Sequence, residues 1–205
     1  MTDKLTKEKL ESTFEDVRKA YRLLYLYQNR VLDIIKHIGS LISKEYYGGW
    51  SKFSKSSPNS GQGKLDSDAW DWLNMYSYDF YFEMDKENKV EFSIWLVSDT
   101  GYYDNATLNN GNKKELNTFS SVKDAETKLI FIAGKNTWYV RSGFNDFEEK
   151  VLKKGSLPYV TKKVNNESNE TEIVVAKSYK LSSFINEEDT IAQCKDFENY
   201  VMKKE

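Results

Sequence analysis

Apolar and polar residues alternate along Met75–Asp99 in two runs separated by a short polar segment. Side chains of a β-strand point to opposite faces with a period of two, so each run has one apolar face and one mixed face. The polar segment Asp85–Lys89 has the length of a hairpin loop, and the pattern therefore predicts two antiparallel strands. The apolar positions are Tyr76, Tyr78, Phe80, Phe82 and Met84 in the first run and Val90, Phe92, Ile94 and Leu96 in the second.

The register of this hairpin follows from joining the two apolar faces. Met84 is then expected opposite Val90, Phe82 opposite Phe92, and Glu83 opposite Glu91. A slip of one residue would turn every apolar side chain to the other face, so the register is strongly constrained.

A long helix is predicted from Thr6 to about Tyr46, because apolar residues recur there in alternating steps of four and three. A continuous helix of this span would be roughly 60 Å long, whereas a compact domain of this size is about 45 Å across. The helix is therefore expected to kink, to break near Gly39, or to project. Since Leu23–Tyr27 is apolar nearly all round, we expect the apolar seam to be buried mostly inside one subunit. The seam consists of Leu10, Phe14, Val17, Tyr21, Leu24, Gln28, Val31, Ile35, Ile38 and Ile42.

Shorter patterns predict the remaining elements. Tyr47–Trp50 ends the first helix, and loop composition follows from Ser51 to Lys64. Asn186 is expected to cap a last helix that has acidic residues in its first turn. Its inner face is Ile191, Cys194, Phe197 and Val201. Further strands are expected at Lys128–Gly134, Thr137–Arg141, Tyr159–Val164 and Glu172–Ser178, and short helices at Lys113–Asp124 and Asp146–Lys154.

Adjacent hairpins with helices at both ends indicate α+β order. We predict one α+β domain over residues 1–205, with an antiparallel sheet of about five strands built from hairpins. A long N-terminal helix, with room for a kink, and a C-terminal helix flank this sheet. Residues 1–46 are expected to be helical, 47–66 to form a mobile loop, and 67–205 to form the sheet and the other helices.

Composition agrees with a single packed domain. The chain has 205 residues, of which 39% are hydrophobic, 30% charged and 15% aromatic, enough for a sizeable core. A net charge of −2 argues against broad attraction to nucleic acid. Cys194 is the only cysteine, which excludes an internal disulfide and a cysteine-based zinc site. No apolar run reaches membrane-spanning length, and the N-terminus lacks a signal-peptide core, so a cytoplasmic location is expected.

Several motif-like segments fail on their details. Gly61–Lys64 resembles a phosphate-binding loop, but Pro58 stands where its first glycine belongs and Leu65 replaces the magnesium-binding hydroxyl. The acidic segment Asp66–Asp71 lacks the glycine and the distal glutamate of a calcium loop. His37 is the only histidine, which argues against a multi-histidine metal site. No cofactor and no metal ion is predicted.

Carboxylates offer the best case for an enzyme. Asp79, Glu83, Glu91 and Asp99 share the mixed face of the hairpin, and clustered acids can hold a divalent cation for phosphodiester hydrolysis. Asp79 and Glu83, however, are about 13 Å apart along one strand and cannot hold the same ion. A solvated sheet face is the favoured interpretation of these acids.

Binding is the third possibility, because aromatic side chains beside carboxylates can stack a ligand or anchor a protein. We predict a non-catalytic, cytoplasmic interaction or ligand-binding module whose partner is a protein or a small ligand. It is expected to be a monomer or a weak dimer. The alternative is a metal-dependent phosphodiester hydrolase that uses Glu83 and Glu91. The candidate binding residues are Asp79, Tyr81, Glu83, Glu91 and Trp95 on the hairpin and Trp70, Trp72 and Tyr102 beside it.

Overall fold

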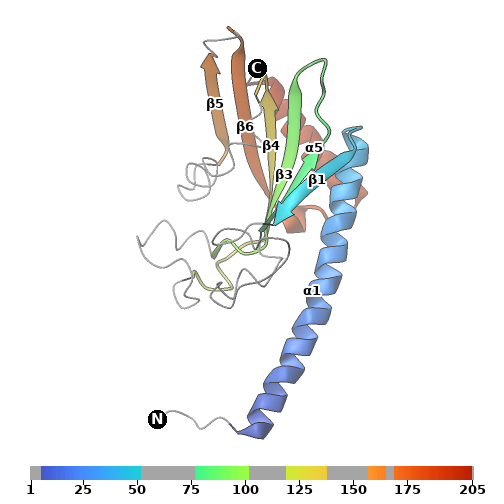
Figure 1. Ribbon diagram of the computed structural model, residues 1–205, viewed down its shortest axis with the longest axis vertical. Helices are drawn as coiled ribbons and strands as arrows, with labels where there is room; N and C mark the ends of the chain where they lie inside the picture. The colour runs from blue at the N-terminus through green and yellow to red at the C-terminus, as the bar shows by residue number, and fades with distance from the viewer. Residues whose placement is uncertain (1–5, 52–76, 102–118, 138–156, 165–168, 205) are drawn as a thin grey trace. The chain divides into compact units, whose positions relative to one another are not determined.

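The structure is a computed structural model that describes residues 6–51, 77–101, 119–137, 157–164 and 169–204. Two compact units, 1–36 and 37–205, divide the chain. Among the described residues, no helix is long and apolar enough to cross a membrane. The elements are α1 (Lys7–Leu41), β1 (Tyr46–Ser51), β2 (Ser77–Phe82), β3 (Val90–Val97), β4 (Lys128–Lys135), β5 (Tyr159–Val164), β6 (Thr171–Lys180), the 3-10 helix η5 (Leu181–Ser183) and α5 (Glu187–Met202) (Figure 1).

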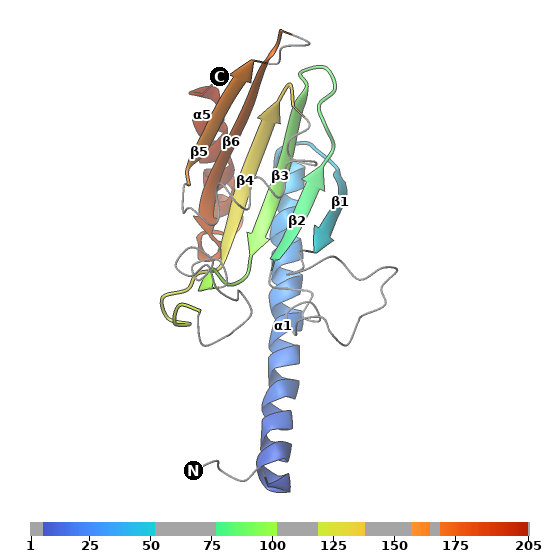
Figure 2. The ribbon, with the colours of Figure 1, turned by 60° about the vertical axis from the view of Figure 1, so that its left-hand side comes forward.

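The six strands form one antiparallel sheet in the order β1-β2-β3-β4-β6-β5 (Figure 2). This confirms the predicted α+β class, with six strands in place of about five. The additional strand is β1, whose residues were expected at the end of a helix and in a loop. That expectation was wrong because Gly49 lets β1 approach β2 very closely. A Cβ atom at Gly49 would collide with the carbonyl oxygen of Asp79.

The first helix is continuous, and it ends at Leu41 before the expected Tyr46. Gly39 does not break the helix. A Cβ atom at Gly39 would lie 2.9 Å from a ring atom of Phe82, so this glycine allows the last turn of α1 to pack tightly. Along the apolar seam, Val17 is 44% and Tyr21 63% exposed, whereas Val31 and Ile35 are buried; burial of the whole seam inside one subunit stays a prediction.

The predicted register holds along the body of the hairpin and fails at its turn. Cα pairs run from Ser77–Val97 to Tyr81–Ser93, as the joined apolar faces require. At the turn, Val90 pairs with Asp85, and not with Met84. The Asp85 carboxylate accepts hydrogen bonds from backbone N–H groups within the turn. Residues 82–84 therefore face only residues 91–92, which is the geometry of a β-bulge, and Glu83 does not lie squarely opposite Glu91.

Other predictions have mixed outcomes. The edge strand β5 and the strand β6 are confirmed. The strand β4 pairs on both sides, with β3 and β6. Of the expected strand Thr137–Arg141, all residues after Thr137 lie outside the described residues. Residues 121–124 form a turn where a short helix was expected. The expected helix Asp146–Lys154 lies outside the described residues.

The last helix begins as predicted, because the Asn186 side chain accepts a hydrogen bond from the N–H of Asp189 at 2.8 Å. It packs on the apolar face of the sheet (Figure 2). The ring of Phe197 lies 5.5 Å from that of Phe131 and 5.9 Å from that of Phe92. Burial of these aromatic rings dominates the core on this side of the sheet.

Candidate ligand-binding site

Four of the predicted binding residues lie on the mixed face of the sheet, opposite the apolar face on which α5 packs. Asp79 pairs with Trp95 across β2 and β3, and Tyr81 lies on the same face. Asp79 is 2%, Tyr81 7%, Glu91 4% and Trp95 0% exposed. The interpretation of this face as solvated was therefore wrong for Asp79 and Glu91. These acids lie in the interior, where they cannot contact a ligand from solution directly.

The second face is buried because the neighbouring strands are apolar on both of their faces. Ile130 and Ile132 of β4 join the cluster around Trp95, and Phe119 and Leu157 pack against it. The uninterrupted apolar run at residues 129–133 indicates a strand that is buried on both faces. The indole N–H of Trp95 donates a hydrogen bond to the Ser77 hydroxyl, which satisfies one buried polar group.

The remaining predicted residues do not join this cluster. Glu83 follows the end of β2 and is exposed. Trp70, Trp72 and Tyr102 lie outside the described residues.

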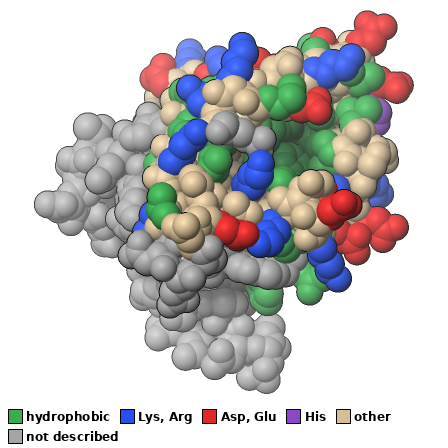
Figure 3. All heavy atoms as spheres, turned by 90° about the horizontal axis from the view of Figure 1, so that it is seen from above, with side chains coloured by type: hydrophobic (Ala, Val, Ile, Leu, Met, Phe, Trp, Pro, Cys, Tyr) green, Lys and Arg blue, Asp and Glu red, His purple; other side chains and the backbone are tan. Residues whose placement is uncertain are grey.

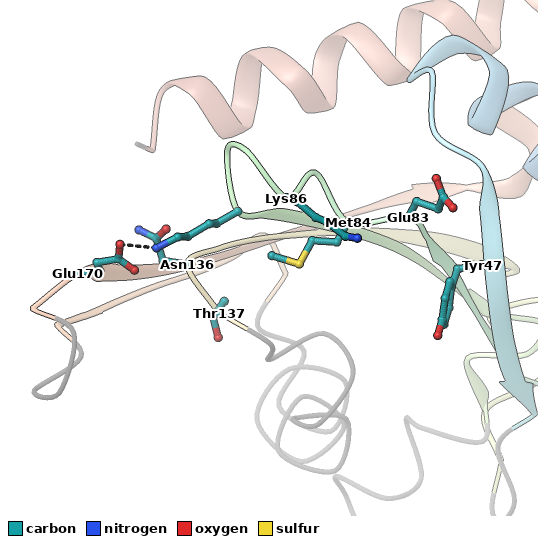
Figure 4. A pocket seen from close by; sticks show the side chains of 8 residues that line it. Tyr47, Glu83, Met84, Lys86, Asn136, Thr137 and Glu170 are labelled. Atoms are coloured by element: carbon teal, nitrogen blue, oxygen red, sulfur yellow. Dashed lines mark hydrogen bonds and ion pairs between the residues drawn. The ribbon is translucent and has the colours of Figure 1, made fainter.

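A cavity of about 750 Å³ opens at the end of the sheet beside the β2–β3 turn (Figure 4). Four segments that are distant in sequence contribute to it: β1, the β2–β3 turn, the residues after β4 and the residue before β6. Its walls carry charged groups of both signs together with amide, hydroxyl and phenol groups. The lining residues are Tyr47, Glu83, Met84, Lys86, Lys89, Asn136, Thr137 and Glu170.

One wall of the cavity is fixed by contacts between its own residues. Lys89 forms an ion pair with Glu170 at 2.5 Å. Asn136 donates from its side chain to the carbonyl of Thr171 at 3.1 Å and from its backbone to the carbonyl of Lys89 at 2.9 Å. Figure 4 shows Glu170, with the dashed line of this ion pair, beside Asn136. Lys89 and Glu170 therefore neutralise each other's charge.

The other two charged groups that line the cavity are Glu83 and Lys86. Within the described part of the chain, neither the Glu83 carboxylate nor the Lys86 ammonium forms an ion pair. In Figure 4 Lys86 lies beside Met84, whereas Glu83 lies farther from Glu170, on the side of Tyr47, with its carboxylate pointing the opposite way from the Tyr47 ring. The Glu83 backbone is held by a 2.9 Å hydrogen bond to the carbonyl of Glu45. Among the residues that the structure describes, Glu83 and Lys86 are therefore the unpaired anion and cation of the cavity, apart from the wall that Lys89, Asn136 and Glu170 fix.

Sequence reasoning identified Glu83 but missed Lys86, Lys89, Asn136 and Glu170. These residues lie outside the strands, and only the fold brings them together. Asn136 was a weak sequence signal of a turn; in the structure both Lys89 and Asn136 adopt a positive φ. Asparagine is enriched in that conformation, but lysine is not.

A second hollow lies between α5 and the apolar face of the sheet, with a volume of about 460 Å³. Figure 3 shows hydrophobic side chains gathered in a hollow and charged side chains around it. Phe92, Phe131 and Cys194 line the groove, and Lys195 and Glu198 are among its polar residues. Burial raises the pKa of the Cys194 thiol to about 11, and the charge of Glu198 adds to this effect. A thiol with so high a pKa is a poor nucleophile at neutral pH.

Metal binding has no obvious location in the described ranges, which contain no group of three or more His, Cys, Asp or Glu side chains suited to an ion. A protein-family model described as PM0109 matches residues 7–205 of the chain. No curated protein and no solved structure matches it.

Proposed function

We propose that this chain, which belongs to the PM0109 family, is a non-catalytic cytoplasmic module that binds a small zwitterionic ligand such as an amino acid. The observation that carries the proposal is the pair of uncommitted charges, Glu83 and Lys86, in the cavity beside the β2–β3 turn. The ligand's ammonium group would pair with Glu83 and its carboxylate with Lys86.

The size and chemistry of the cavity support a small polar ligand. Ligand sites typically have volumes of roughly 300–1,000 Å³ with a few polar groups that fix orientation, and about 750 Å³ lies within that range. The neighbouring pair of Lys89 and Glu170 keeps the wall in place and is already neutralised. Recognition would therefore depend on Glu83 and Lys86, and Thr137 and Tyr47 also line the cavity.

The test is a thermal-shift screen of the common amino acids, followed by calorimetry of each compound that raises the melting temperature. A ligand at 100 times its dissociation constant stabilises the native state by about 2.7 kcal/mol. Glu83→Gln and Lys86→Met should each weaken binding by about tenfold or more, because a charge-assisted hydrogen bond is lost. Glu87→Gln is the matched control, since Glu87 lies in the same turn but does not line the cavity. Absence of any shift or heat across the whole panel would refute the proposal.

The hydrolase alternative requires Glu83 and Glu91 to hold one metal ion. Glu91 is 4% exposed whereas Glu83 is exposed, so the geometry supports binding better than metal-dependent hydrolysis. Thermal melts with chelator and with manganese distinguish the two functions. We expect manganese to leave the melting temperature unchanged. A rise in the wild type that disappears in Glu91→Gln would favour the hydrolase.

A further inference from the structure

We infer that the groove beside α5 is a second binding site, which takes the alkyl chain of a free fatty acid and holds its carboxylate at the rim. The α5 groove is the hollow of about 460 Å³ between α5, the end of α1 and the apolar face of the sheet (Figure 3). Its lining residues all belong to the unit 37–205. None of the described residues that line it also lines the polar cavity beside the β2–β3 turn.

The groove lies between two helical segments that cover different strands of the apolar face. The end of α1 packs on β2, since a Cβ atom at Gly39 would lie 2.9 Å from a ring atom of Phe82. Helix α5 packs over β3 and β4, where the ring of Phe197 lies 5.9 Å from that of Phe92 and 5.5 Å from that of Phe131. The apolar face is therefore left partly open between the two segments.

The floor of the groove and its wall on α5 are mainly apolar. On the floor, Phe92 of β3 pairs with Ala133 of β4, and each is 8% exposed. On the predicted inner face of α5, Phe197 is 5% exposed. The other members of that face line the groove and are only half-buried: Ile191, Cys194 and Val201. A ligand that covered them would remove further apolar surface from water, which is favourable.

The size of the groove favours a small molecule over a protein partner. Its volume of about 460 Å³ lies within the roughly 300–1,000 Å³ that is typical of ligand sites, which are also mostly apolar. Fourteen described residues line it, whereas a protein interface uses roughly 20–30 residues on each side. An alkyl chain carries no polar atom, so an apolar groove can cover it without leaving a hydrogen-bonding group unpaired.

The charged residues of the groove favour an anionic headgroup. Two lysines and one glutamate line it, which gives an excess of one positive charge: Lys44, Lys195 and Glu198. Among the ion pairs of the described residues, none includes Lys44 or Lys195. The backbone of Lys44 is fixed, because its N–H donates a 3.1 Å hydrogen bond to the carbonyl of Gly39. A carboxylate at the rim would gain a charge-assisted hydrogen bond from either lysine.

Asp85 is a further acid that acts on Lys44. Asn88 is the main cause of the lowered pKa of Asp85, and Lys44 is a minor one. The Asp85 carboxylate accepts hydrogen bonds from the backbone N–H groups of Glu87 and Asn88 within its own turn. Lys44 is therefore available to a ligand in the groove.

The first experiment is calorimetric titration of the full chain with hexanoate, octanoate and decanoate, each below its micelle concentration. We expect the affinity to rise by about tenfold at each step, because each step buries two more methylene groups. Decanol and decylamine carry the same chain with a neutral and a cationic headgroup. Each should bind about threefold more weakly than decanoate, or weaker still, because the contact of the carboxylate with the lysines is lost.

A second experiment tests the headgroup contact. Lys44→Met and Lys195→Met should each weaken decanoate binding by about threefold and leave decanol binding unchanged, because only the carboxylate loses a partner. A merely structural role of either lysine would weaken both ligands alike. Lys203→Met is the matched control. Lys203 is exposed just after α5 and does not line the groove, so decanoate should bind this variant as it binds the wild type.

A third experiment fills the groove. Cys194→Phe places a larger side chain in it and should abolish the binding of decanoate and of decanol. Cys194→Ala keeps the groove open and should bind both. Val201→Trp, at another half-buried position that lines the groove, is a second filling variant in case Cys194→Phe does not fold. Thermal unfolding shows which variants are folded.

Three outcomes would overturn the inference. The first is no binding of decanoate to the wild type by calorimetry and by equilibrium dialysis. The second is binding of decylamine as tight as that of decanoate. The third is unchanged decanoate binding in a folded filling variant. Glu83→Gln distinguishes this site from the polar cavity, because it should weaken amino-acid binding there and leave decanoate binding unchanged. Loss of decanoate binding in Glu83→Gln would place the fatty acid in the polar cavity and also contradict the α5 groove.

Discussion

Asp196 of α5 contacts two side chains of β6. Its replacement should show how much each of these contacts contributes to the free energy of unfolding. One oxygen of its carboxylate accepts hydrogen bonds from the Tyr179 hydroxyl and from the Lys177 ammonium, both at 2.6 Å. Lys177 is the larger cause of the lowered pKa of Asp196, and Tyr179 is the second. For the free energy of unfolding we expect the opposite order. Tyr179 is 7% exposed, whereas the Lys177 and Asp196 side chains are 28% and 49% exposed, so that water can replace their pairing.

The magnitudes follow from this difference in burial. Asp196→Ala leaves a largely buried hydroxyl without its acceptor, which costs about 1–3 kcal/mol. The partly exposed ion pair adds about 0.2–1 kcal/mol, so we expect a loss near 2 kcal/mol. Asp196→Asn keeps an acceptor for Tyr179 and loses only the charge, so it should cost less than about 1 kcal/mol. Alanine has a higher helix propensity than asparagine. Helix propensity alone would therefore make Asp196→Ala the more stable variant, opposite to the order that we predict.

Urea denaturation of both variants, together with Tyr179→Phe and the corresponding double variant, gives the coupling energy directly. Equal losses for Asp196→Asn and Asp196→Ala would refute the reasoning and assign the contribution to Lys177. The pH dependence supplies a second check. Because the folded-state pKa of Asp196 is lowered from 3.8, its stabilisation is complete above that pH and is lost as the pH falls further. The difference between wild type and Asp196→Asn should therefore shrink below about pH 4.

Three further outcomes are expected. Asn186→Ala removes the cap of α5 and should cost about 1 kcal/mol in urea denaturation, whereas Asn186→Ser should retain most of the stability. The two lysines that contact Glu126 lower its pKa to about 2, so stability from this group is present above about pH 4.5 and is lost toward pH 2. Glu126→Gln should accordingly flatten that part of the pH–stability curve, by less than about 1 kcal/mol because the cluster is partly exposed. Gly49→Ala should destabilise by about 1–3 kcal/mol because its Cβ atom would meet Asp79, while Gly48→Ala, with open space around it, should be tolerated; equal effects would contradict the role given to Gly49.

Local pattern was sufficient to predict the elements whose stability depends on their own sequence. The alternation in β2 and β3 predicted both strands and their register, and Asn186 predicted the start of α5. The edge strand β1 was missed because Gly48 and Gly49 have low strand propensity. Only close packing against Asp79, a tertiary effect, makes glycine suitable there.

The candidate site was less predictable for the same physical reason. Alternation in β2 and β3 indicated a mixed face, but the cover over Asp79 and Glu91 depends on apolar residues in other strands. The cavity combines Glu83 and Lys86 with Asn136 and Glu170, which are separated by long stretches of chain. No spacing rule relates such turns, because only the order of strands in the sheet decides that they meet.

The edges of the sheet have a consequence for crowded solutions. An open strand edge is a template onto which another chain can add, leading to fibrous aggregates. Here β1 has an irregular register between Tyr46 and Gly48, and β5 carries the exposed Lys162 and Lys163. An incoming strand would meet a strand with an irregular backbone at one edge and positive charge at the other. Addition of strands is therefore disfavoured at both edges of the sheet that the described residues form.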